Sequence, residues 1–434
     1  MAEHQSLPEM FFARARELAQ QTRYIVKRGG EWVHVTWAEH ERAVLEIAAG
    51  LIAAGVAPGT KIALLSATRP EWMEVDFAIL AAGGVTIPIY PSNLPAECGY
   101  IIWNSESAFC VSENDAQRKK ITAVTDEGFE LDGQTSLVAL RGVFQIDGEG
   151  EGSVASLRER GRAALASGAR EEIERRIRGI KRGDVATIVY TSGTTGPPKG
   201  VVQTHGNHLA TIRALDAIGG FGKGEVEFMF LPLAHSFARA NEFFGTSAGL
   251  ITAFAQKIET IPDDLRATKP HYIPSVPRIF EKIYGRILST AAAAGFPKKA
   301  IFDWAVMVGR EKSRAIQEGR TPPIWIEAQA LIADRLVSST IREQLGGRVR
   351  FMISGGAPLA REIQEFFHAV GVLILEGYGL TETTPLLTAN TPDAFCFGTV
   401  GRAVEGVTLK IAEDGEILAK GPNVALGYFK RPEA

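Results

Sequence analysis

A segment rich in glycine and threonine at residues 191–200 follows an apolar run at residues 186–190 that predicts a buried strand. Glycines permit positive φ and let a ligand approach the main chain, while successive amides and hydroxyls can surround phosphate oxygens. Lys199 adds a mobile positive charge. A plain turn between strand and helix is the alternative, but the clustering of these residue types favours phosphate binding. The predicted phosphate-binding residues are Thr191, Ser192, Gly193, Thr194, Thr195, Gly196 and Lys199.

The spacing around Lys199 differs from that of a Walker P-loop, in which a lysine directly follows a glycine and precedes Ser or Thr. Here Pro197 and Pro198 precede the lysine and Gly200 follows it. Prolines also lack the amides that a helix start would offer to a phosphate. The sequence therefore disfavours a general nucleoside triphosphatase.

Two further glycine-bearing segments follow predicted strands. SGGAP at residues 354–358 comes directly after an apolar run at 349–353, and EGYGLTE at 376–382 comes directly after a run at 372–375. Ligands of parallel α/β sheets bind beyond the carboxyl ends of the strands. We therefore expect the three loops to converge on one crevice.

The sequence YTSGTTGPPKGVVQTH at residues 190–205 resembles the signature of the adenylate-forming superfamily, which comprises acyl-CoA synthetases, adenylation domains of peptide synthetases and luciferases. SGGAP and EGYGLTE are similar to further motifs of that family and occur in its order. The resemblance covers nearly the whole chain and implies ATP, Mg²⁺ and coenzyme A as cofactors or co-substrates. The family's C-terminal domain, which carries a mobile lysine, is absent from the sequence. We therefore expect an N-terminal domain that binds nucleotide weakly, adenylates little alone, and pairs with its own C-terminal domain in the full-length protein.

The resemblance also implies roles at the nucleotide site. Thr191 and Glu382 would give oxygen ligands to Mg²⁺, which usually takes only one or two from the protein. Thr381 would contact the α-phosphate and Tyr378 would stack on adenine. A simple helix cap at Thr381 and Glu382 is the alternative interpretation. The expected catalytic residues are Lys199, Thr381, Glu382 and His235, and further nucleotide contacts are expected from Gly355, Gly356, Ala357, Glu376, Gly377 and Gly379.

The segment LPLAHSF, which ends at Phe237, is similar to the family's segment at the acyl-carboxylate end of the site. There His235 would orient the incoming carboxylate or gate the acyl tunnel, and a satisfied structural histidine is the alternative. Phe237 is the candidate for the family's aromatic gate, and Arg239 departs from the family pattern. Ser354 and Gly355 complete the predicted substrate-binding set.

The segment VPRIFEKIY at residues 276–284 and the long helical section at 298–345 resemble the long-chain fatty acyl-CoA synthetase branch. An apolar tunnel would suit an alkyl chain, because each buried methylene contributes about 0.8 kcal/mol. An adenylation enzyme that loads another acid onto a carrier protein is the nearest alternative. A non-catalytic module that binds fatty acid or acyl-adenylate is disfavoured, since it would not need the set Thr191, Lys199 and Glu382.

The chain has 434 residues, 45% of them hydrophobic, and this predicts more than one core. Short apolar strands alternate with helices, which implies parallel sheets covered on both faces. We expect an α/β fold with two similar multi-layer subdomains and a small C-terminal β-barrel-like subdomain. The expected boundaries are 1–180, with a hairpin at 24–37; 181–395, with strands at 186–190, 251–255, 271–273, 349–353 and 372–375; and 396–434, with a hairpin at 407–420.

Composition excludes several classes of function. With 47 basic and 50 acidic residues, the net charge of -3 gives no general case for nucleic-acid binding. Cys98, Cys110 and Cys396 are too few and too far apart for a disulfide framework or a paired metal-ligand pattern. No secretory signal and no run of 18 apolar residues occurs. We expect a cytoplasmic protein, with possible peripheral membrane contact through Trp304 and Trp325.

Overall fold

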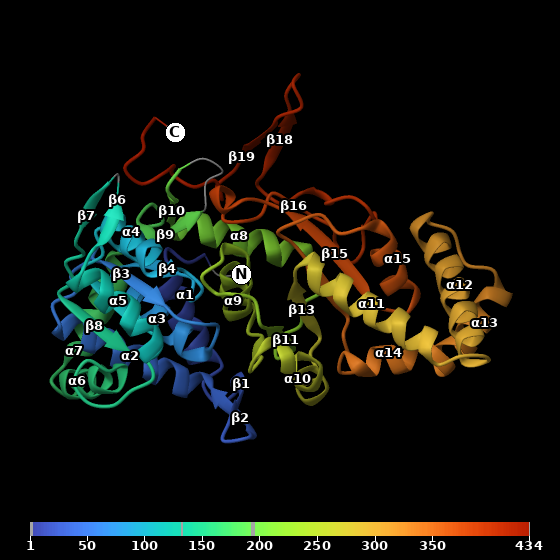
Figure 1. The fold of residues 1–434 in the computed structure, drawn as a ribbon, viewed down its shortest axis with the longest axis horizontal. Coiled ribbons are helices and arrows are strands. Elements are labelled where there is room, and N and C mark those ends of the chain that lie inside the picture. The colour runs from blue at the N-terminus through green and yellow to red at the C-terminus, as the bar shows by residue number, and fades with distance from the viewer. Residues whose placement is uncertain (1–2, 132, 192–195, 434) are drawn as a thin grey trace.

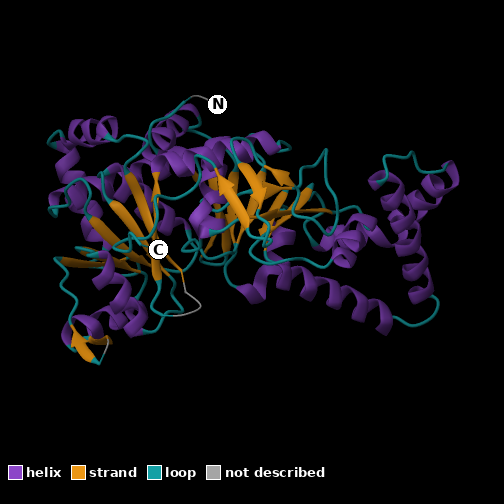
Figure 2. Ribbon diagram, turned by 90° about the horizontal axis from the view of Figure 1, so that it is seen from above, coloured by secondary structure: helices purple, strands orange, loops and turns teal. Residues whose placement is uncertain are grey.

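The computed structural model describes residues 3–131, 133–191 and 196–433. It contains two large β-sheets, each flanked by helices, which lie next to each other in both Figure 1 and Figure 2. The sheets are mostly parallel, and this confirms the predicted α/β fold class. Among the described helices, none is both long enough and apolar enough to cross a membrane.

The six-stranded sheet has the order β10-β9-β4-β3-β5-β8 and is parallel except at its edge strand β10. Its central strands are buried along almost their whole length, as expected where helices cover both faces. Its strands are β3 (Lys61–Leu65), β4 (Val85–Ile89), β5 (Phe109–Ser112), β8 (Gly142–Gln145), β9 (Val185–Thr191) and β10 (Lys199–Thr204), and the elements around it are α2 (Trp37–Ala53), α3 (Pro70–Ala81), α4 (Pro95–Ser105), α5 (Asp115–Asp126), α6 (Val154–Ala166), α7 (Ala169–Gly179) and the small hairpin β6 (Phe129–Leu131) and β7 (Gln134–Ser136).

The nine-stranded sheet has the order β17-β16-β15-β14-β13-β11-β12-β1-β2, with a parallel centre and antiparallel pairs at both edges. Its strands are β1 (Thr22–Arg28), β2 (Glu31–Thr36), β11 (Val226–Met229), β12 (Ile251–Phe254), β13 (Tyr272–Ser275), β14 (Phe351–Ser354), β15 (Leu373–Tyr378), β16 (Thr388–Ala389) and β17 (Arg402–Ala403), and the helices beside it include α1 (Leu7–Glu17), α8 (His205–Ile218), α9 (Ser236–Ala248), α10 (Ile261–Thr268), α14 (Ser339–Gln344) and α15 (Arg361–Ala369).

The chain crosses from one sheet to the other between β2 and β3 and again between β10 and β11, which the sequence did not predict. The predicted hairpin near the N-terminus forms as β1 and β2, but it extends the nine-stranded sheet through β12. The strand predicted at residues 186–190 forms as β9, but it pairs with β4 in the six-stranded sheet. The buried guanidinium of Arg23 on β1 stabilises the pairing of β1 with β12, because it donates hydrogen bonds to Thr252 and to the carbonyl of Leu250. The predicted boundary between residues 180 and 181 therefore does not coincide with the division of the strands between the two sheets.

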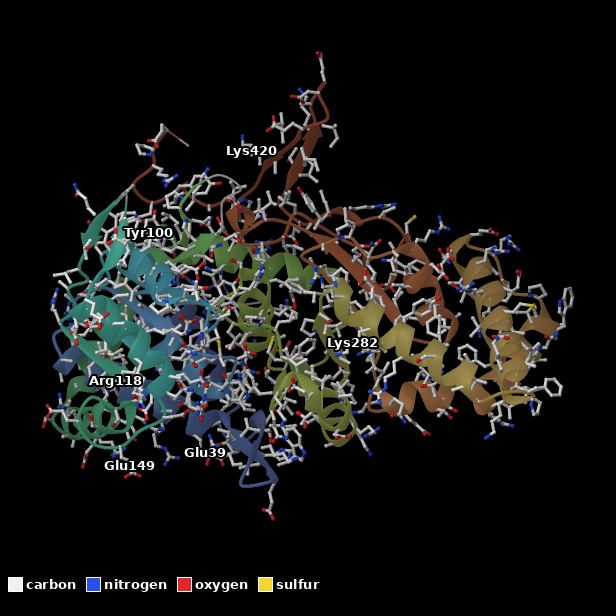
Figure 3. The ribbon with its side chains drawn as sticks, in the orientation of Figure 1. Glu39, Tyr100, Arg118, Glu149, Lys282 and Lys420 are labelled. Atoms are coloured by element: carbon white, nitrogen blue, oxygen red, sulfur yellow. The ribbon has the colours of Figure 1, made fainter. Side chains whose placement is uncertain are left out.

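The predicted β-barrel-like subdomain at the C-terminal end is also corrected. The predicted hairpin is present as β18 (Thr408–Ile411) and β19 (Ile417–Lys420), and it projects from the molecule with Lys420 near its base (Figures 1 and 3). Its two strands are largely exposed, and the described residues around it form no closed barrel. The following chain instead adds to the edge of the six-stranded sheet, where Leu426 N–H donates to the Val202 carbonyl at 3.0 Å.

Three helices form an arm at the end of the molecule farthest from the six-stranded sheet (Figures 1 and 2). The arm leaves β13 through α11, and its second helix packs on α15 at Gly309, where an added β-carbon would lie 2.2 Å from the Ala369 carbonyl oxygen. Its third helix is apolar yet largely exposed, with Ile324 at 83% and Trp325 at 63%. The arm consists of α11 (Pro277–Ala293), α12 (Lys298–Gln317) and α13 (Ile324–Ala333).

A buried ion pair joins α9, beside the nine-stranded sheet, to α3, beside the six-stranded sheet. Nε and an Nη of Arg239 donate to the two carboxylate oxygens of Asp76 at 2.9 and 2.6 Å. Thr86 Oγ1 donates to the same carboxylate at 2.7 Å, and the guanidinium lies 5.5 Å from the ring centroid of Trp72. Arg239, which departs from the family pattern near the predicted gate, is therefore a buried residue that connects the two halves of the molecule.

We predict that Arg239→Met destabilises the fold by about 3–5 kcal/mol, because it leaves the Asp76 carboxylate buried without its partner. Urea unfolding measures the change. Arg213→Met is the matched control, since Arg213 forms an exposed ion pair with Glu405, and it is expected to cost less than about 1 kcal/mol. Equal effects of the two substitutions would contradict the assigned role of Arg239.

Candidate active site

A cavity of about 420 Å³ is lined by residues of both sheets and of α8 and α9. Most of the predicted site residues meet there, although they come from segments nearly 200 residues apart. Gly196 and Ala357 are described but are not among the lining residues, and Ser192, Gly193, Thr194 and Thr195 lie outside the described residues. The predicted residues that line the cavity are Thr191, Lys199, His235, Phe237, Ser354, Gly355, Gly356, Glu376, Gly377, Tyr378, Gly379, Thr381 and Glu382.

The β9–β10 pair places the predicted phosphate-binding lysine. In the antiparallel register Lys199 lies opposite Thr191, so that both side chains stand at the same end of the pair. The Lys199 ammonium lies 4.9 Å from the centroid of the Tyr428 ring. An aromatic face attracts a cation but carries no net negative charge, and the ammonium can therefore still bind an anion.

The loop after β15 carries the predicted acidic ligand. Thr381 and Glu382 lie in a single turn of 3-10 helix, η3 (Thr381–Thr383), and do not cap a longer helix. Gln203 of β10 donates to the Thr381 carbonyl at 2.7 Å, which fixes this turn to the strand that begins at Lys199. Glu382 accepts a hydrogen bond from the Tyr428 hydroxyl at 2.8 Å.

Glycine is required within this loop for close approach of two backbone segments. A β-carbon added to Gly379 would lie 1.7 Å from the Pro385 carbonyl oxygen. The chain can therefore fold back behind Tyr378, whose carbonyl accepts from Leu387 N–H at 2.8 Å. The glycine beside Tyr378 thus shapes the turn that presents η3 to the cavity.

The carboxylate of Glu376 is engaged within the protein. It accepts hydrogen bonds from Leu359 N–H at 3.0 Å and from the Gln364 side chain at 2.9 Å, and burial raises its pKa. These bonds hold the loop after β14 against β15. The loop also packs on the predicted gate, because a β-carbon on Gly355 would lie 3.3 Å from the Phe237 ring.

His235 begins α9 and reaches the cavity. Its Nδ1 accepts a hydrogen bond from Phe237 N–H at 3.1 Å, and partial desolvation lowers its pKa. The lowered pKa favours the neutral ring, and since Nδ1 is an acceptor, the proton of the neutral ring is on Nε2. His235 can therefore donate one hydrogen bond from Nε2 to an oxygen atom in the cavity.

One end of the cavity is apolar, and the sequence did not single out its residues. Behind Phe221 lie Phe244 and Tyr272, with ring centroids 4.6 and 4.9 Å from it. The Tyr272 hydroxyl donates to the Gly220 carbonyl at 2.9 Å and thereby fixes the short loop that carries Phe221. The only sign of this apolar cluster in the sequence was that Phe221 lies between glycines. The apolar lining residues are Leu215, Ile218, Phe221, Phe351, Ile353 and Leu375.

Comparison with known proteins places the chain in a family. Residues 11–429 match the model of the AMP-binding enzyme family. The chain belongs to this family. This confirms the predicted family membership.

Similar proteins and structures agree with this assignment. The long-chain-fatty-acid–CoA ligase FadD15 of Mycobacterium bovis is 36% identical in an alignment of 436 positions that covers 100% of this chain and 70% of that protein. The peroxisomal long chain acyl-CoA synthetase 7 of Arabidopsis thaliana is 32% identical, over 93% of this chain and 58% of its own length. The inhibitor-bound N-terminal domain of FACL13 from Mycobacterium tuberculosis shares the fold, with a TM-score of 0.70 at 20% identity over 99% of this chain and 92% of that one.

The donor set in the cavity fits the magnesium ion that the family implies. Glu382 and Thr191 offer oxygen atoms, as a hard cation prefers. No cluster of three or more His, Cys, Asp or Glu that could hold a metal occurs among the described residues. A cation bound here would therefore take most of its ligands from phosphates and water, which is the usual arrangement for Mg²⁺ at nucleotide sites.

We predict that Gly379→Ala weakens binding of an ATP analogue at least about tenfold, equivalent to 1.4 kcal/mol, because the turn carrying Thr381 and Glu382 must move. Calorimetric titration measures the affinity. Gly183→Ala is the matched control, since Gly183, like Gly379, has no positive φ, but an added β-carbon there meets nothing within 4 Å. Unchanged affinity in Gly379→Ala would show that this turn is not needed for nucleotide binding.

Proposed function

We propose that this chain activates a long-chain fatty acid with ATP to an acyl-adenylate and pyrophosphate, and that coenzyme A then accepts the acyl group. One observation carries the proposal: a single cavity joins a polar end, formed by Thr191, Lys199 and Glu382, to an apolar end that includes Phe221. The polar groups suit phosphates and the apolar groups suit an alkyl chain. The names of the similar proteins reported above support the same substrate class.

The polar end would hold ATP for attack on its α-phosphorus. Lys199 would neutralise phosphate oxygens while negative charge moves onto the departing pyrophosphate. Thr381 would donate to the α-phosphate, and Tyr378 would stack on adenine beside Gly355. Thr191 and Glu382 would hold Mg²⁺, which when bound offsets the repulsion between the phosphates and the incoming carboxylate.

The apolar end would hold the acid with its carboxylate toward the nucleotide. The Nε2–H of His235 would donate to one carboxylate oxygen, and the other oxygen would attack phosphorus in line with the leaving pyrophosphate. Burial of the alkyl chain contributes about 0.8 kcal/mol for each methylene. Binding energy from the chain would thus orient the reacting carboxylate.

The second half-reaction would transfer the acyl group to a thiol. The thiol sulfur of coenzyme A would attack the acyl carbon, its proton would be lost, and AMP would leave. A phosphopantetheine thiol on a carrier protein is the alternative acceptor. A non-catalytic role would leave the metal carboxylate Glu382 without a purpose.

The helical arm supports peripheral contact with a membrane surface as part of this proposal. Trp325, Ile324 and Leu331 of α13 are all more than 60% exposed. Apolar side chains of this kind can enter the interface between lipid headgroups and acyl chains. Trp304 is less suited, because its ring N–H faces Gln329 within the arm.

A panel of fatty acids with ATP and Mg²⁺ tests the proposal on the full-length protein, with AMP release as the measured quantity. We expect AMP release that depends on a long-chain acid and acyl-CoA as the product when coenzyme A is supplied. A phosphopantetheinyl carrier protein offered in a parallel reaction distinguishes the alternative acceptor. ATP consumption without any dependence on an acid would contradict the proposal.

We predict that Phe221→Ala shifts the preferred acid toward longer chains, because removal of this lining ring would extend the cavity toward Phe244 and Tyr272. Each further methylene accommodated is worth about 0.8 kcal/mol, or roughly a fourfold gain in kcat/KM. The ratio of kcat/KM across the panel measures the shift. Phe395→Ala, which removes a ring outside the cavity lining, is expected to leave the ratio unchanged.

A further inference from the structure

A C-terminal strap, residues 422–429, is fastened across the rim of the cavity by side-chain amides. Asn207 of α8 donates to the Pro422 and Val424 carbonyls at 2.8 and 2.9 Å. Asn423 belongs to the strap and is buried, and its side-chain amide donates to the Thr383 carbonyl at 2.9 Å. The strap is therefore held both by the helix after β10 and by the loop that carries Glu382.

The end of the strap pairs with the strand that begins at the predicted phosphate-binding lysine. Val202 N–H donates to the Gly427 carbonyl at 2.9 Å, and Phe429 N–H donates to the Gly200 carbonyl at 2.7 Å. The main chain of Glu382 joins the same strap, because its carbonyl accepts from Ala425 N–H at 2.8 Å. These backbone hydrogen bonds hold the main chain at Tyr428 in place, and they do not depend on the tyrosine side chain.

Tyr428 lies between two groups of opposite charge. Its hydroxyl donates to Glu382 Oε1 at 2.8 Å, and its ring faces the Lys199 ammonium at 4.9 Å. An ammonium and a carboxylate in one cavity attract each other. Yet neither Lys199 nor Glu382 forms an ion pair with any described residue, while each contacts Tyr428.

We propose that Tyr428 is a positioning residue that keeps Lys199 and Glu382 from pairing with each other and directs both toward the cavity. The ring holds the ammonium by its face, and the hydroxyl donates to Oε1 of the carboxylate, so that the other carboxylate oxygen would be available to a metal ion. The inference rests on the proposed function, because it assigns the ammonium to phosphate and the carboxylate to Mg²⁺. It adds a role for a residue outside the three glycine-bearing loops.

The hydroxyl and the ring of Tyr428 can be removed one at a time, so that the effect on Glu382 and the effect on Lys199 can be measured separately. Tyr428→Phe keeps the ring and removes the hydroxyl, so the gain in nucleotide affinity produced by Mg²⁺ should fall by about tenfold, the value of a hydrogen bond to a charged group. Tyr428→Leu also removes the ring. Lys199 can then pair with Glu382, and affinity without Mg²⁺ should fall by about threefold as well.

Calorimetric titration with α,β-methylene-ATP, once in excess EDTA and once with MgCl₂, measures both quantities without turnover. Phe429→Leu is the matched control, since Phe429 lies on the same strap but its ring contacts Lys61 instead. It should bind as the unsubstituted chain does. Thermal melting shows whether each variant is folded, and Tyr428→Phe decides the outcome if Tyr428→Leu melts below the assay temperature.

Double substitutions test whether Tyr428 acts through Lys199 and Glu382. In a Lys199→Met chain, Tyr428→Leu should cause no further loss in EDTA, and in a Glu382→Gln chain, Tyr428→Phe should cause no further loss with MgCl₂. Equal losses with and without Mg²⁺, or affinities like those of Phe429→Leu, would overturn the role of Tyr428. Failure of the unsubstituted chain to bind the nucleotide at all would instead overturn the proposed function on which this role depends.

Discussion

The alignment of β10 is the constraint on which the site depends. This strand carries Lys199 at its start and Gln203 near its end, and the Gln203 side chain fixes the Thr381 carbonyl of the other sheet at 2.7 Å. A strand gives its side chains a spacing that cannot vary, because each residue advances by about 3.3 Å. The lysine and the acidic turn therefore keep one separation for as long as β10 stays paired.

A buried ion pair keeps the two sheets in this relation, because Arg239 on α9 pairs with Asp76 on α3. A second buried pair, Arg23 with Glu242, joins the N-terminal hairpin to α9 within the half that contains the nine-stranded sheet. Both guanidinium groups are almost completely buried, and an unpaired charge is costly in such surroundings. Sliding of one half past the other would separate Arg239 from Asp76, and the protein itself thus fixes the cavity between the sheets.

The amino-acid sequence predicted which loops line the cavity better than it predicted the sheets around them. Glycine-rich loops directly after apolar strands pointed to Lys199, Tyr378 and Glu382, because residues suited to phosphate binding form a local pattern in the sequence. The sequence of β9 does not show which sheet this strand joins, since a buried apolar run suits either sheet equally well. The role of Tyr428 is also invisible locally, because its partner Glu382 is 46 residues earlier in the chain.

The helical arm is less stable against local unfolding than the two sheets are. Only Pro277 and Phe280 of α11 and Ala333 of α13 are buried, so these helices have little packing to hold them. Segments with few buried apolar contacts open at a lower free energy than the whole protein does. Amide hydrogen exchange and proteolytic cleavage would therefore begin in the arm, while the two sheets and the loops that line the cavity between them stay intact.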